Sequence, residues 1–342
     1  MEISVDDVCA AARRLDNKAV RTPLLESPLL NARLGCRVLA KAESLQLTGS
    51  FKFRGAYNRI SQLSPGELRT GVVAYSTGNH AQGVAAAAGY LGAKAVIVVP
   101  RDTPLIKQDN TRAWGAELAF YDRDTEDRAA VARAIAEERG GAVIVPPYDD
   151  PQVIAGQGTI GLEIAAQARE TGAPLDAVII PVGGGGLAAG ISTAIKALSP
   201  ESPIFMAEPE AYDDTRRSFA AGERLANDTR PGHPTTFCDA LTAPIPGEIT
   251  FPINRRNVSA VVTLTDDEVC RGLYAAFADF KLVLEPSGAI ALAAVVTGVL
   301  GKAFDFKGKT IAVVCSGGNV DPAAYADALR RGAPSADAAI PT

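Results

Sequence analysis

Short runs of β-branched residues alternate with alanine-rich stretches of helical spacing through most of the chain. The first series predicts strands at 72–75, 95–99, 117–121 and 143–145, and helices at about 83–89, 104–114 and 126–139. The second series predicts strands at 177–182, 204–207, 258–263 and 310–315, and helices at about 187–198, 266–280 and 287–299. This alternation is typical of βαβ units in a mostly parallel sheet that helices cover on both faces. It predicts an α/β protein of two lobes.

Residues 221–256 interrupt this pattern, because they are polar and rich in proline. We predict a long loop here, and long loops inside a compact fold are usually functional.

Composition narrows the class of protein. The 342 residues are 47% hydrophobic and 21% charged, which are globular proportions, and the formal net charge at pH 7 is −5. This charge argues against nucleic acid or an anionic membrane as the main partner. The weakly polar stretch 83–100 contains Lys94 and several glycines, so it does not predict a membrane span. Acidic residues near the N-terminus, where a signal peptide carries positive charge, predict a cytoplasmic protein.

The five cysteines are scattered without a CxxC pair, so we expect reduced thiols. Two histidines cannot build a multi-histidine metal centre, and no GxSxG motif supports a serine hydrolase.

The first chemical motif spans residues 48–56 and contains Lys52 among small and aromatic residues at the start of a predicted helix. Partial desolvation lowers the pKa of such a lysine and makes its amine a nucleophile. A surface lysine at a helix end is the alternative interpretation.

The second motif, residues 76–80, lies directly between a predicted strand and an alanine-rich helix. Backbone N–H groups and hydroxyls at such a turn can bind a carboxylate or a phosphate. A simple capped helix start is the alternative.

The third motif has four consecutive glycines at 183–186, again after a strand and before a helix. Such a loop can wrap its N–H groups around a phosphate. The spacing of Gly183, Gly185 and Ala188 also satisfies a relaxed dinucleotide fingerprint, with Glu208 where a ribose-binding acid would lie. A nicotinamide-dependent oxidoreductase therefore remains an alternative.

The fourth motif ends the strand 310–315 with a polar, glycine-rich turn that begins at Ser316. Residues 284–289, which include Glu285, lie just upstream in the sequence. Because ligands bind at the carboxyl ends of strands in α/β sheets, Ser316 can present its hydroxyl to a ring heteroatom.

In this order the four motifs resemble those of fold type II pyridoxal-phosphate enzymes, the tryptophan-synthase-β type. The resemblance covers about residues 21–319, and residues 41–52, 154–163 and 181–186 resemble the threonine dehydratase and serine racemase branch. It implies a large cofactor-binding domain of residues 1–47 and 148–342 and a small domain of residues 48–147 that carries the substrate carboxylate loop. It also implies a homodimer.

The resemblance assigns roles to residues of all four motifs. Lys52 would bind pyridoxal phosphate covalently and later carry the α proton. The residues implied around the cofactor are Phe51, Lys52, Asn79 at the ring hydroxyl, Gly183, Gly184, Gly185, Gly186 and Leu187 at the phosphate, Glu285, and Ser316 at the ring nitrogen. The residues implied at the substrate carboxylate are Ser76, Thr77, Asn79 and His80.

The neutral Ser316 favours β-elimination, because a hydroxyl does not stabilise a protonated ring and leaves a weaker electron sink. We therefore predict a dehydratase (ammonia-lyase) that converts a 3-hydroxy-2-amino acid such as threonine or serine into a 2-oxo acid and ammonia. Serine racemase activity is expected to be minor, with Thr77 as the catalytic group on the opposite face.

The acidic segment 207–214 resembles the divalent-cation loop of the same branch. Glu208, Asp214 and the carbonyl of Tyr212 would bind Mg²⁺, Mn²⁺ or Ca²⁺. A solvated acidic loop is the alternative interpretation.

The substrate side chain is the least determined feature. Ala240 replaces a glycine that is typical of the branch in the loop 237–247, which puts plain threonine specificity in doubt. The resemblance to the serine racemase branch implies that Arg128 would meet a second carboxylate and that Tyr148 is a further lining candidate. 3-Hydroxyaspartate and phenylserine therefore stay open as substrates. An arginine paired with its acidic neighbours is the alternative for Arg128.

Overall fold

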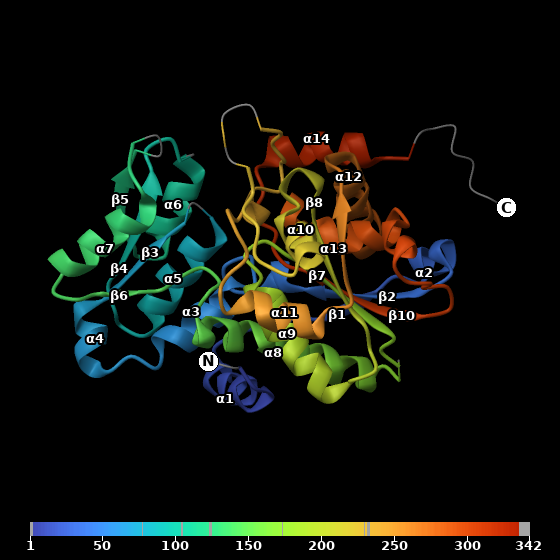
Figure 1. The fold of residues 1–342 in the computed structure, drawn as a ribbon, viewed down its shortest axis with the longest axis horizontal. Coiled ribbons are helices and arrows are strands. Elements are labelled where there is room, and N and C mark those ends of the chain that lie inside the picture. Colours follow the sequence, from blue (N-terminus) through green and yellow to red (C-terminus); the bar gives the residue numbers. More distant parts are fainter. Residues whose placement is uncertain are drawn as a thin grey trace.

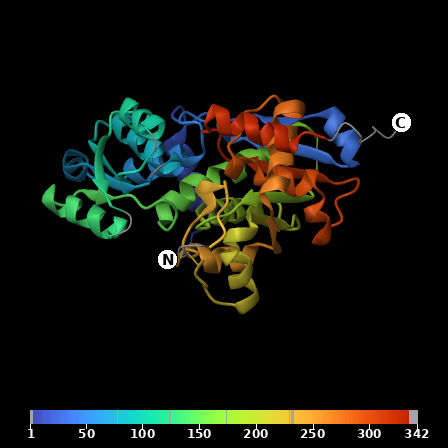
Figure 2. The same ribbon diagram turned by 90° about the horizontal axis from the view of Figure 1, so that it is seen from above.

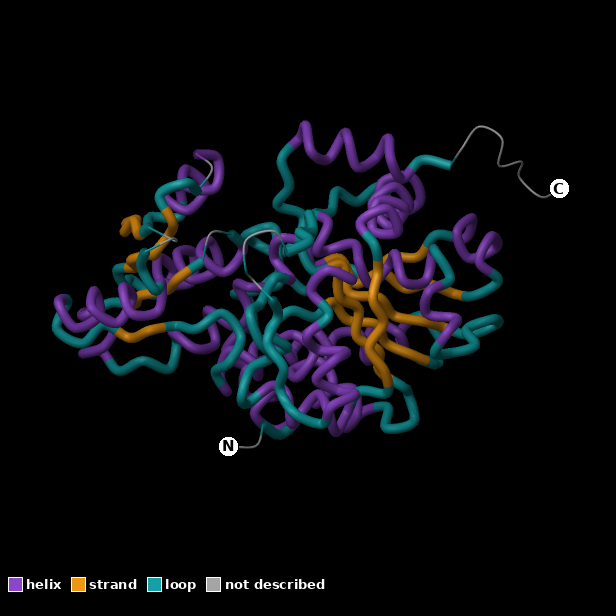
Figure 3. The backbone as a smooth tube through the Cα atoms, turned by 45° about the horizontal axis from the view of Figure 1, so that its top comes forward, coloured by secondary structure: helices purple, strands orange, loops and turns teal. Residues whose placement is uncertain are grey.

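The computed structural model describes residues 3–76, 78–103, 105–122, 125–172, 174–228, 230 and 233–334. Its strands form two separate sheets, which Figure 3 shows as two groups of strands. The smaller sheet has the order β5-β4-β3-β6 and is parallel throughout. The larger sheet has the order β1-β2-β10-β7-β8-β9, and only β1 is antiparallel. The predicted α/β class with two lobes is confirmed (Figures 1 and 2).

The small lobe consists of consecutive strand and helix units. Its strands are β3 (Val72–Tyr75), β4 (Ala95–Pro100), β5 (Glu117–Tyr121) and β6 (Val143–Ile144). Its helices are α3 (Lys52–Ile60), α4 (Pro65–Thr70), α5 (Asn79–Tyr90), α6 (Leu105–Ala113) and α7 (Arg128–Glu138). Alternate strand residues face opposite sides: Ala74 and Ile97 pack with α3 and α5, whereas Val73 and Val98 pack with α7.

The large lobe uses segments from both ends of the chain. Its strands are β1 (Leu24–Glu26), β2 (Arg37–Ala42), β7 (Ala177–Pro181), β8 (Ile204–Pro209), β9 (Ala260–Leu264) and β10 (Thr310–Cys315). Its helices are α1 (Val5–Leu15), α2 (Pro28–Leu34), α8 (Pro151–Glu170), α9 (Gly186–Leu198), α10 (Asp214–Ala221), α11 (Thr250–Asn257), α12 (Asp266–Ala275), α13 (Pro286–Val296) and α14 (Pro322–Gly332).

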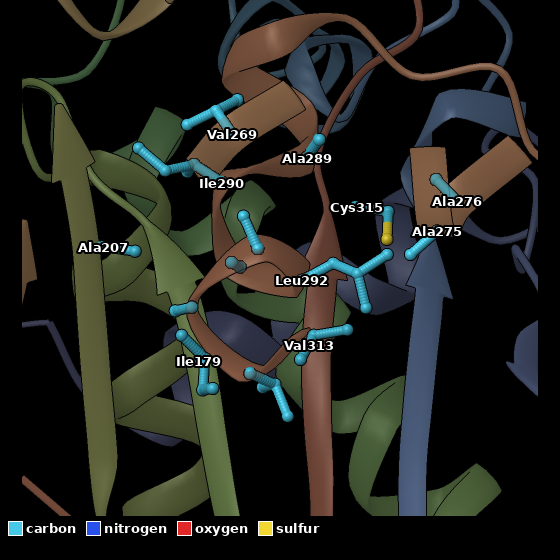
Figure 4. Close-up of a cluster of buried hydrophobic side chains, with 14 of the residues drawn as sticks. Ile179, Ala207, Val269, Ala275, Ala276, Ala289, Ile290, Leu292, Val313 and Cys315 are labelled. Atoms are coloured by element: carbon cyan, nitrogen blue, oxygen red, sulfur yellow. The ribbon is translucent and has the colours of Figure 1, made fainter. Parts of the chain in front are cut away.

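Helices cover the large sheet on both faces, as its hydrophobic strands require. Ile179 and Val313 face α12 and α13, where Leu292 lies in the same apolar cluster (Figure 4). Their neighbours Val178 and Ala312 point to the other face, which α8 and α9 cover. No helix in the described ranges is long and apolar enough to cross a membrane.

Two predicted elements differ from the structure. The expected loop 221–256 contains helix α11, whose Pro252 lies in the first turn, where a missing N–H is tolerated. The expected helix 266–280 ends as α-helix at Ala275 and continues as a π-helix, Ala276–Phe280, which ends in a left-handed Lys281.

A buried network of four charged side chains joins the two lobes. Arg54 of α3 is 1% exposed and donates to Glu43 at 2.8 Å and to Glu163 of α8 at 2.6 Å. Lys41 of β2 also donates to Glu163. Two cations and two carboxylates thus neutralise one another inside the protein.

The small residues between α3 and α8 bring their backbones into contact. A Cβ atom on Gly156 would lie 2.6 Å from the Cα atom of Gly55 and 2.7 Å from the carbonyl of Arg54. Only glycine permits this approach, so the helix that begins with Lys52 lies directly against α8.

Replacing Arg54 by methionine is expected to lower the free energy of unfolding by about 3–5 kcal/mol, because the buried Glu43 carboxylate loses the guanidinium that neutralises it and Glu163 keeps only Lys41. Arg59→Met on the same helix is the control, since Arg59 forms a less buried pair with Asp150 at 3.1 Å. Denaturant unfolding measures both, and equal losses would contradict a special role for the Arg54 network.

Candidate active site

A cleft of about 790 Å³ lies between the lobes and is lined by residues of all four sequence motifs. The predicted cofactor and substrate residues that line it are Phe51, Lys52, Ser76, Asn79, His80, Arg128, Tyr148, Gly183, Gly184, Gly185, Gly186, Leu187, Glu285 and Ser316. Thr77, the predicted opposite-face group, lies outside the described residues. The cleft collects the carboxyl ends of β3, β7 and β10, where α/β sheets bind their ligands.

Lys52 is the first residue of α3, and its amine points into the cleft wall. Its Nζ atom donates to the carbonyl of Pro147 at 2.7 Å and lies 5.1 Å from the centre of the Phe51 ring. Burial lowers the pKa of Lys52 to about 8, against a smaller opposing effect of Glu285. The amine is therefore poised to act as a nucleophile and a base near neutral pH, unlike a surface lysine.

The turn after β3 places Asn79 and His80 at the start of α5. His80 Nε2 lies 2.8 Å from the carbonyl of Val145, which can only accept a hydrogen bond, so Nε2 carries the proton. Burial lowers the pKa of His80 to about 3, which keeps the ring neutral. Nδ1 then lacks a proton, so any contact of His80 with a substrate carboxylate must come from its backbone N–H.

Glu285 is buried beside Asn79, whose amide donates to it at 2.5 Å. Burial, with a smaller contribution from Asp239, raises the pKa of Glu285 to about 8. Glu285 is therefore mainly a neutral acid at pH 7. Asn79 also accepts a hydrogen bond from Asn319 at 2.8 Å, so its side chain is fixed from two sides.

Ser316 follows β10 and is 4% exposed. Its carbonyl accepts the N–H of Phe51 at 3.1 Å. This bond ties the end of β10 to the residue before Lys52, so the two motifs hold a common position in the cleft.

The glycine loop 183–186 connects β7 to α9. Gly185 has φ of 92°, a left-handed conformation that favours glycine. A Cβ atom on Gly184 would lie 2.4 Å from the Tyr148 ring. In the described part of the chain, no hydrogen bond engages the N–H groups of Gly184 and Gly185. The Tyr148 ring thus leaves no room for a side chain on Gly184, and the loop offers free N–H donors, as a phosphate site requires.

Arg128 is the first residue of α7, and its guanidinium lies 5.6 Å from the centre of the Tyr75 ring. Its acidic neighbours have other partners: Asp127 caps α7 at the N–H of Ala130, and Glu126 accepts the N–H of Asp122. Asp124, a further acid beside Arg128, lies outside the described residues.

Tyr148 lies near Arg128 and Tyr75, and burial raises the pKa of its hydroxyl. This hydroxyl lies 3.5 Å from the carbonyl of Ile245. A cation and two phenol rings thus form one wall of the cleft.

The predicted metal ligands lie outside the cleft lining. Glu208 ends β8 and accepts the N–H groups of Thr215 and Arg216, while Asp214 Oδ1 accepts from Asn227 at 2.8 Å. Asp214 Oδ2 is buried without a partner among the described residues, and burial raises the pKa of Asp214 to about 7. The rings of Tyr212 and His233 make an edge-to-face contact, with their centres 5.9 Å apart.

These two carboxylates are buried, so the alternative of a solvated acidic loop is wrong for Glu208 and Asp214. However, no group of three or more His, Cys, Asp or Glu side chains in the described ranges could hold a metal ion.

The sequence interpretation missed several residues that shape the site. Asp149, Thr250 and Asn254 fix the glycine loop from behind, and Lys107 of α6 pairs with Asp239 at 2.6 Å at the cleft. None of them stands in a recognisable motif. Their partners lie about 70 to 130 residues away in sequence, beyond the reach of local patterns.

Comparison with known proteins places these features in a family. Residues 15–317 match the family model described as "Pyridoxal-phosphate dependent enzyme". The chain is 42% identical to L-threo-3-hydroxyaspartate ammonia-lyase of a Pseudomonas species, over 96% of this chain and 98% of that protein.

Two solved structures are also similar over nearly their whole lengths. The T.th. threonine deaminase has a TM-score of 0.85 and 46% identity, with 93% of this chain and 99% of that chain covered. Maize serine racemase has a TM-score of 0.88 and 34% identity, with coverage of 97% and 98%.

The lowered pKa of Lys52 predicts the pH dependence of cofactor uptake. Only the neutral amine attacks the aldehyde of pyridoxal phosphate, so uptake by the apoprotein is expected to rise with pH through about 8. The absorbance change on mixing measures the rate, and borohydride should trap the cofactor on Lys52. A midpoint near the ordinary lysine pKa would contradict the desolvation of this amine, and Lys52→Ala should show no trapping.

Proposed function

The chain belongs to the family of pyridoxal-phosphate dependent enzymes, and we propose that it is an ammonia-lyase that eliminates water from 3-hydroxyaspartate. At the coarser level, it is a pyridoxal-phosphate dependent lyase of 3-hydroxy amino acids. The family decides against the nicotinamide alternative, and Glu208, the acid expected at a ribose, does not line the cleft.

The residues of the cleft fit the cofactor. The free N–H groups of the glycine loop suit its phosphate, the Lys52 amine suits its aldehyde, and Asn79 and Ser316 line the space between them. When bound, the cofactor supplies a conjugated ring that takes up the electron pair left at Cα. The chain's own residues hold the substrate and move the protons.

Lys52 is the base of the proposed reaction. With its pKa lowered to about 8, the Nζ atom can accept the α proton of the substrate at neutral pH and return it later. The Cβ–OH bond breaks with loss of water, and hydrolysis of the resulting enamine gives a 2-oxo acid and ammonia. The backbone N–H groups at the start of α5 suit the α-carboxylate, because a helix N-terminus favours an anion.

Arg128 is the observation that carries the choice of substrate. Its guanidinium lines the cleft beside Tyr75, and the neighbouring carboxylates of Glu126 and Asp127 accept backbone N–H groups. A guanidinium binds a carboxylate through two parallel hydrogen bonds, whereas the methyl group of threonine offers it nothing. The second carboxylate of 3-hydroxyaspartate therefore suits this wall of the cleft better than the side chain of threonine, serine or phenylserine.

A divalent cation at Glu208 and Asp214 is part of the proposal. The unpartnered Asp214 Oδ2 and the burial of both carboxylates support it, because a cation would bind this free oxygen and offset the cost of burying the charges. Homodimerisation, a cytoplasmic location and a minor racemase activity through Thr77 stay predictions.

Arg128→Ala is expected to lower kcat/KM for 3-hydroxyaspartate about thirtyfold or more, which corresponds to about 2 kcal/mol, while leaving threonine and serine within about twofold. Ammonia release measures all three substrates. Arg133→Ala on the same helix is the matched control, since Arg133 is 61% exposed and does not line the cleft. Equal losses on every substrate would make Arg128 structural and leave the side-chain pocket to Tyr148 and residues 238–242.

Removal of divalent cations is expected to lower the melting temperature, and Mg²⁺, Mn²⁺ or Ca²⁺ should restore it. Glu208→Gln and Asp214→Asn should each abolish this response, because a carboxylate charge is lost while the shape is kept. Thermal unfolding with and without chelator measures the effect. A wild-type protein that ignores the chelator would leave Glu208 and Asp214 as a hydrogen-bonded acid pair without a metal.

A further inference from the structure

Asp149 binds three consecutive backbone N–H groups of the loop that precedes α11. Its Oδ2 atom accepts from Glu248 at 2.9 Å, and its Oδ1 atom accepts from Ile249 at 2.9 Å and from Thr250 at 3.4 Å. Hydrogen bonds to an ionised acceptor are stronger than neutral ones. The carboxylate therefore fixes the loop 247–250 in one place.

This loop in turn holds the glycine loop by its carbonyl groups. Gly184 accepts hydrogen bonds from the Thr250 hydroxyl at 2.7 Å and from the N–H of Gly247 at 3.2 Å. The carbonyl of Gly185 accepts from the Asn254 amide at 3.1 Å. The Gly185 carbonyl also accepts the N–H of Ala189 in α9 at 2.9 Å. Both carbonyls are thus held by donors from α11, and that of Gly185 from α9 as well.

Peptide geometry converts these bonds into an orientation of N–H groups. The carbonyl of one residue and the N–H of the next belong to one planar trans peptide and point in opposite directions. With the carbonyls of Gly184 and Gly185 turned toward α11, the N–H groups of Gly185 and Gly186 point the other way. Both glycines line the cleft, so these donors can meet a phosphate there.

Close packing keeps this arrangement from relaxing. A Cβ atom on Gly247 would lie 2.3 Å from Asp149 Oδ1, and one on Gly185 would lie 2.7 Å from Thr250 Oγ1. The Asp149 carboxylate, the loop and the glycines therefore fit together without spare volume.

We propose that Asp149 is a positioning residue that orients the glycine loop to bind the phosphate group of the cofactor. Its negative charge alone would repel a phosphate, so its benefit comes from the three hydrogen bonds and not from attraction. The inference rests on the proposed function only in taking the cofactor's phosphate as the ligand of the loop.

The experiment compares three ligands on the apoprotein: inorganic phosphate, pyridoxal phosphate, and pyridoxal, which lacks the phosphate. Asp149→Ala is expected to weaken binding of pyridoxal phosphate about tenfold or more and to weaken stabilisation by inorganic phosphate. Affinity for pyridoxal should change less than twofold. Absorbance titration measures the two aldehydes, thermal unfolding measures phosphate, and the ³¹P resonance of bound cofactor should shift.

Asp150→Ala is the matched control. Asp150 also accepts two backbone N–H groups, those of Gln152 and Val153, and its hydrogen bonds among the described residues go to α8 and to Arg59, not to the loop 247–250. It should lower stability and leave the affinity for phosphate unchanged. A merely structural role of Asp149 would make the two variants alike.

If Asp149→Ala does not fold, Thr250→Val offers a second test, because it removes only the hydrogen bond from the Thr250 hydroxyl to the Gly184 carbonyl. Thr250→Val should weaken binding of inorganic phosphate and pyridoxal phosphate and leave the affinity for pyridoxal unchanged. Thr250→Ser should bind all three ligands as the wild type does. If the folded variants bind phosphate as tightly as the wild type, the inference is overturned, whereas the proposed lyase activity is not affected. Conversely, if the wild-type protein releases no ammonia but Asp149→Ala still weakens phosphate binding, only the proposed function is overturned.

Discussion

The Arg54 guanidinium is enclosed by the carboxylates of Glu43 and Glu163. The position of Lys52 relative to helix α8, on which the active site depends, follows from this interaction. Arg54 lies two residues after Lys52, and Glu163 lies on the helix that follows Pro147 and Asp149. A charge that is desolvated this completely tolerates little displacement from its partners. Lys52 and the segment behind the glycine loop are therefore held in fixed positions relative to each other.

The site is assembled by the ends of strands that are far apart in sequence. The end of β3 leads to Asn79 and His80, the end of β7 leads to the glycine loop, and the end of β10 leads to Ser316. Each turn is secured by a second segment: Glu285 holds Asn79, α11 holds the glycines, and Ser316 itself holds Phe51. Hydrogen bonds from other segments thus fix the conformations of the turns that form the cleft.

Local patterns predict the parts of this protein that depend on neighbours in sequence. The βαβ periodicity, the helix start at Lys52 and the glycines after β7 follow from spacing and composition. Helix α11 could not be predicted in this way, because its proline and polar residues are typical of a loop. Its buried residues Phe251 and Ile253 pack only once the fold has formed. The protonation of His80 depends on the carbonyl of Val145, 65 residues away, and no sequence pattern carries that information.

The neutral ring of His80 has a consequence for how the enzyme meets its surroundings. A histidine beside a substrate carboxylate usually makes affinity follow ambient acidity, because the imidazole gains a charge between about pH 5 and 8. Here burial holds the pKa of His80 near 3, so its ring gains no charge in that interval. The imidazole itself therefore adds no dependence on acidity to the binding of an anion at this turn.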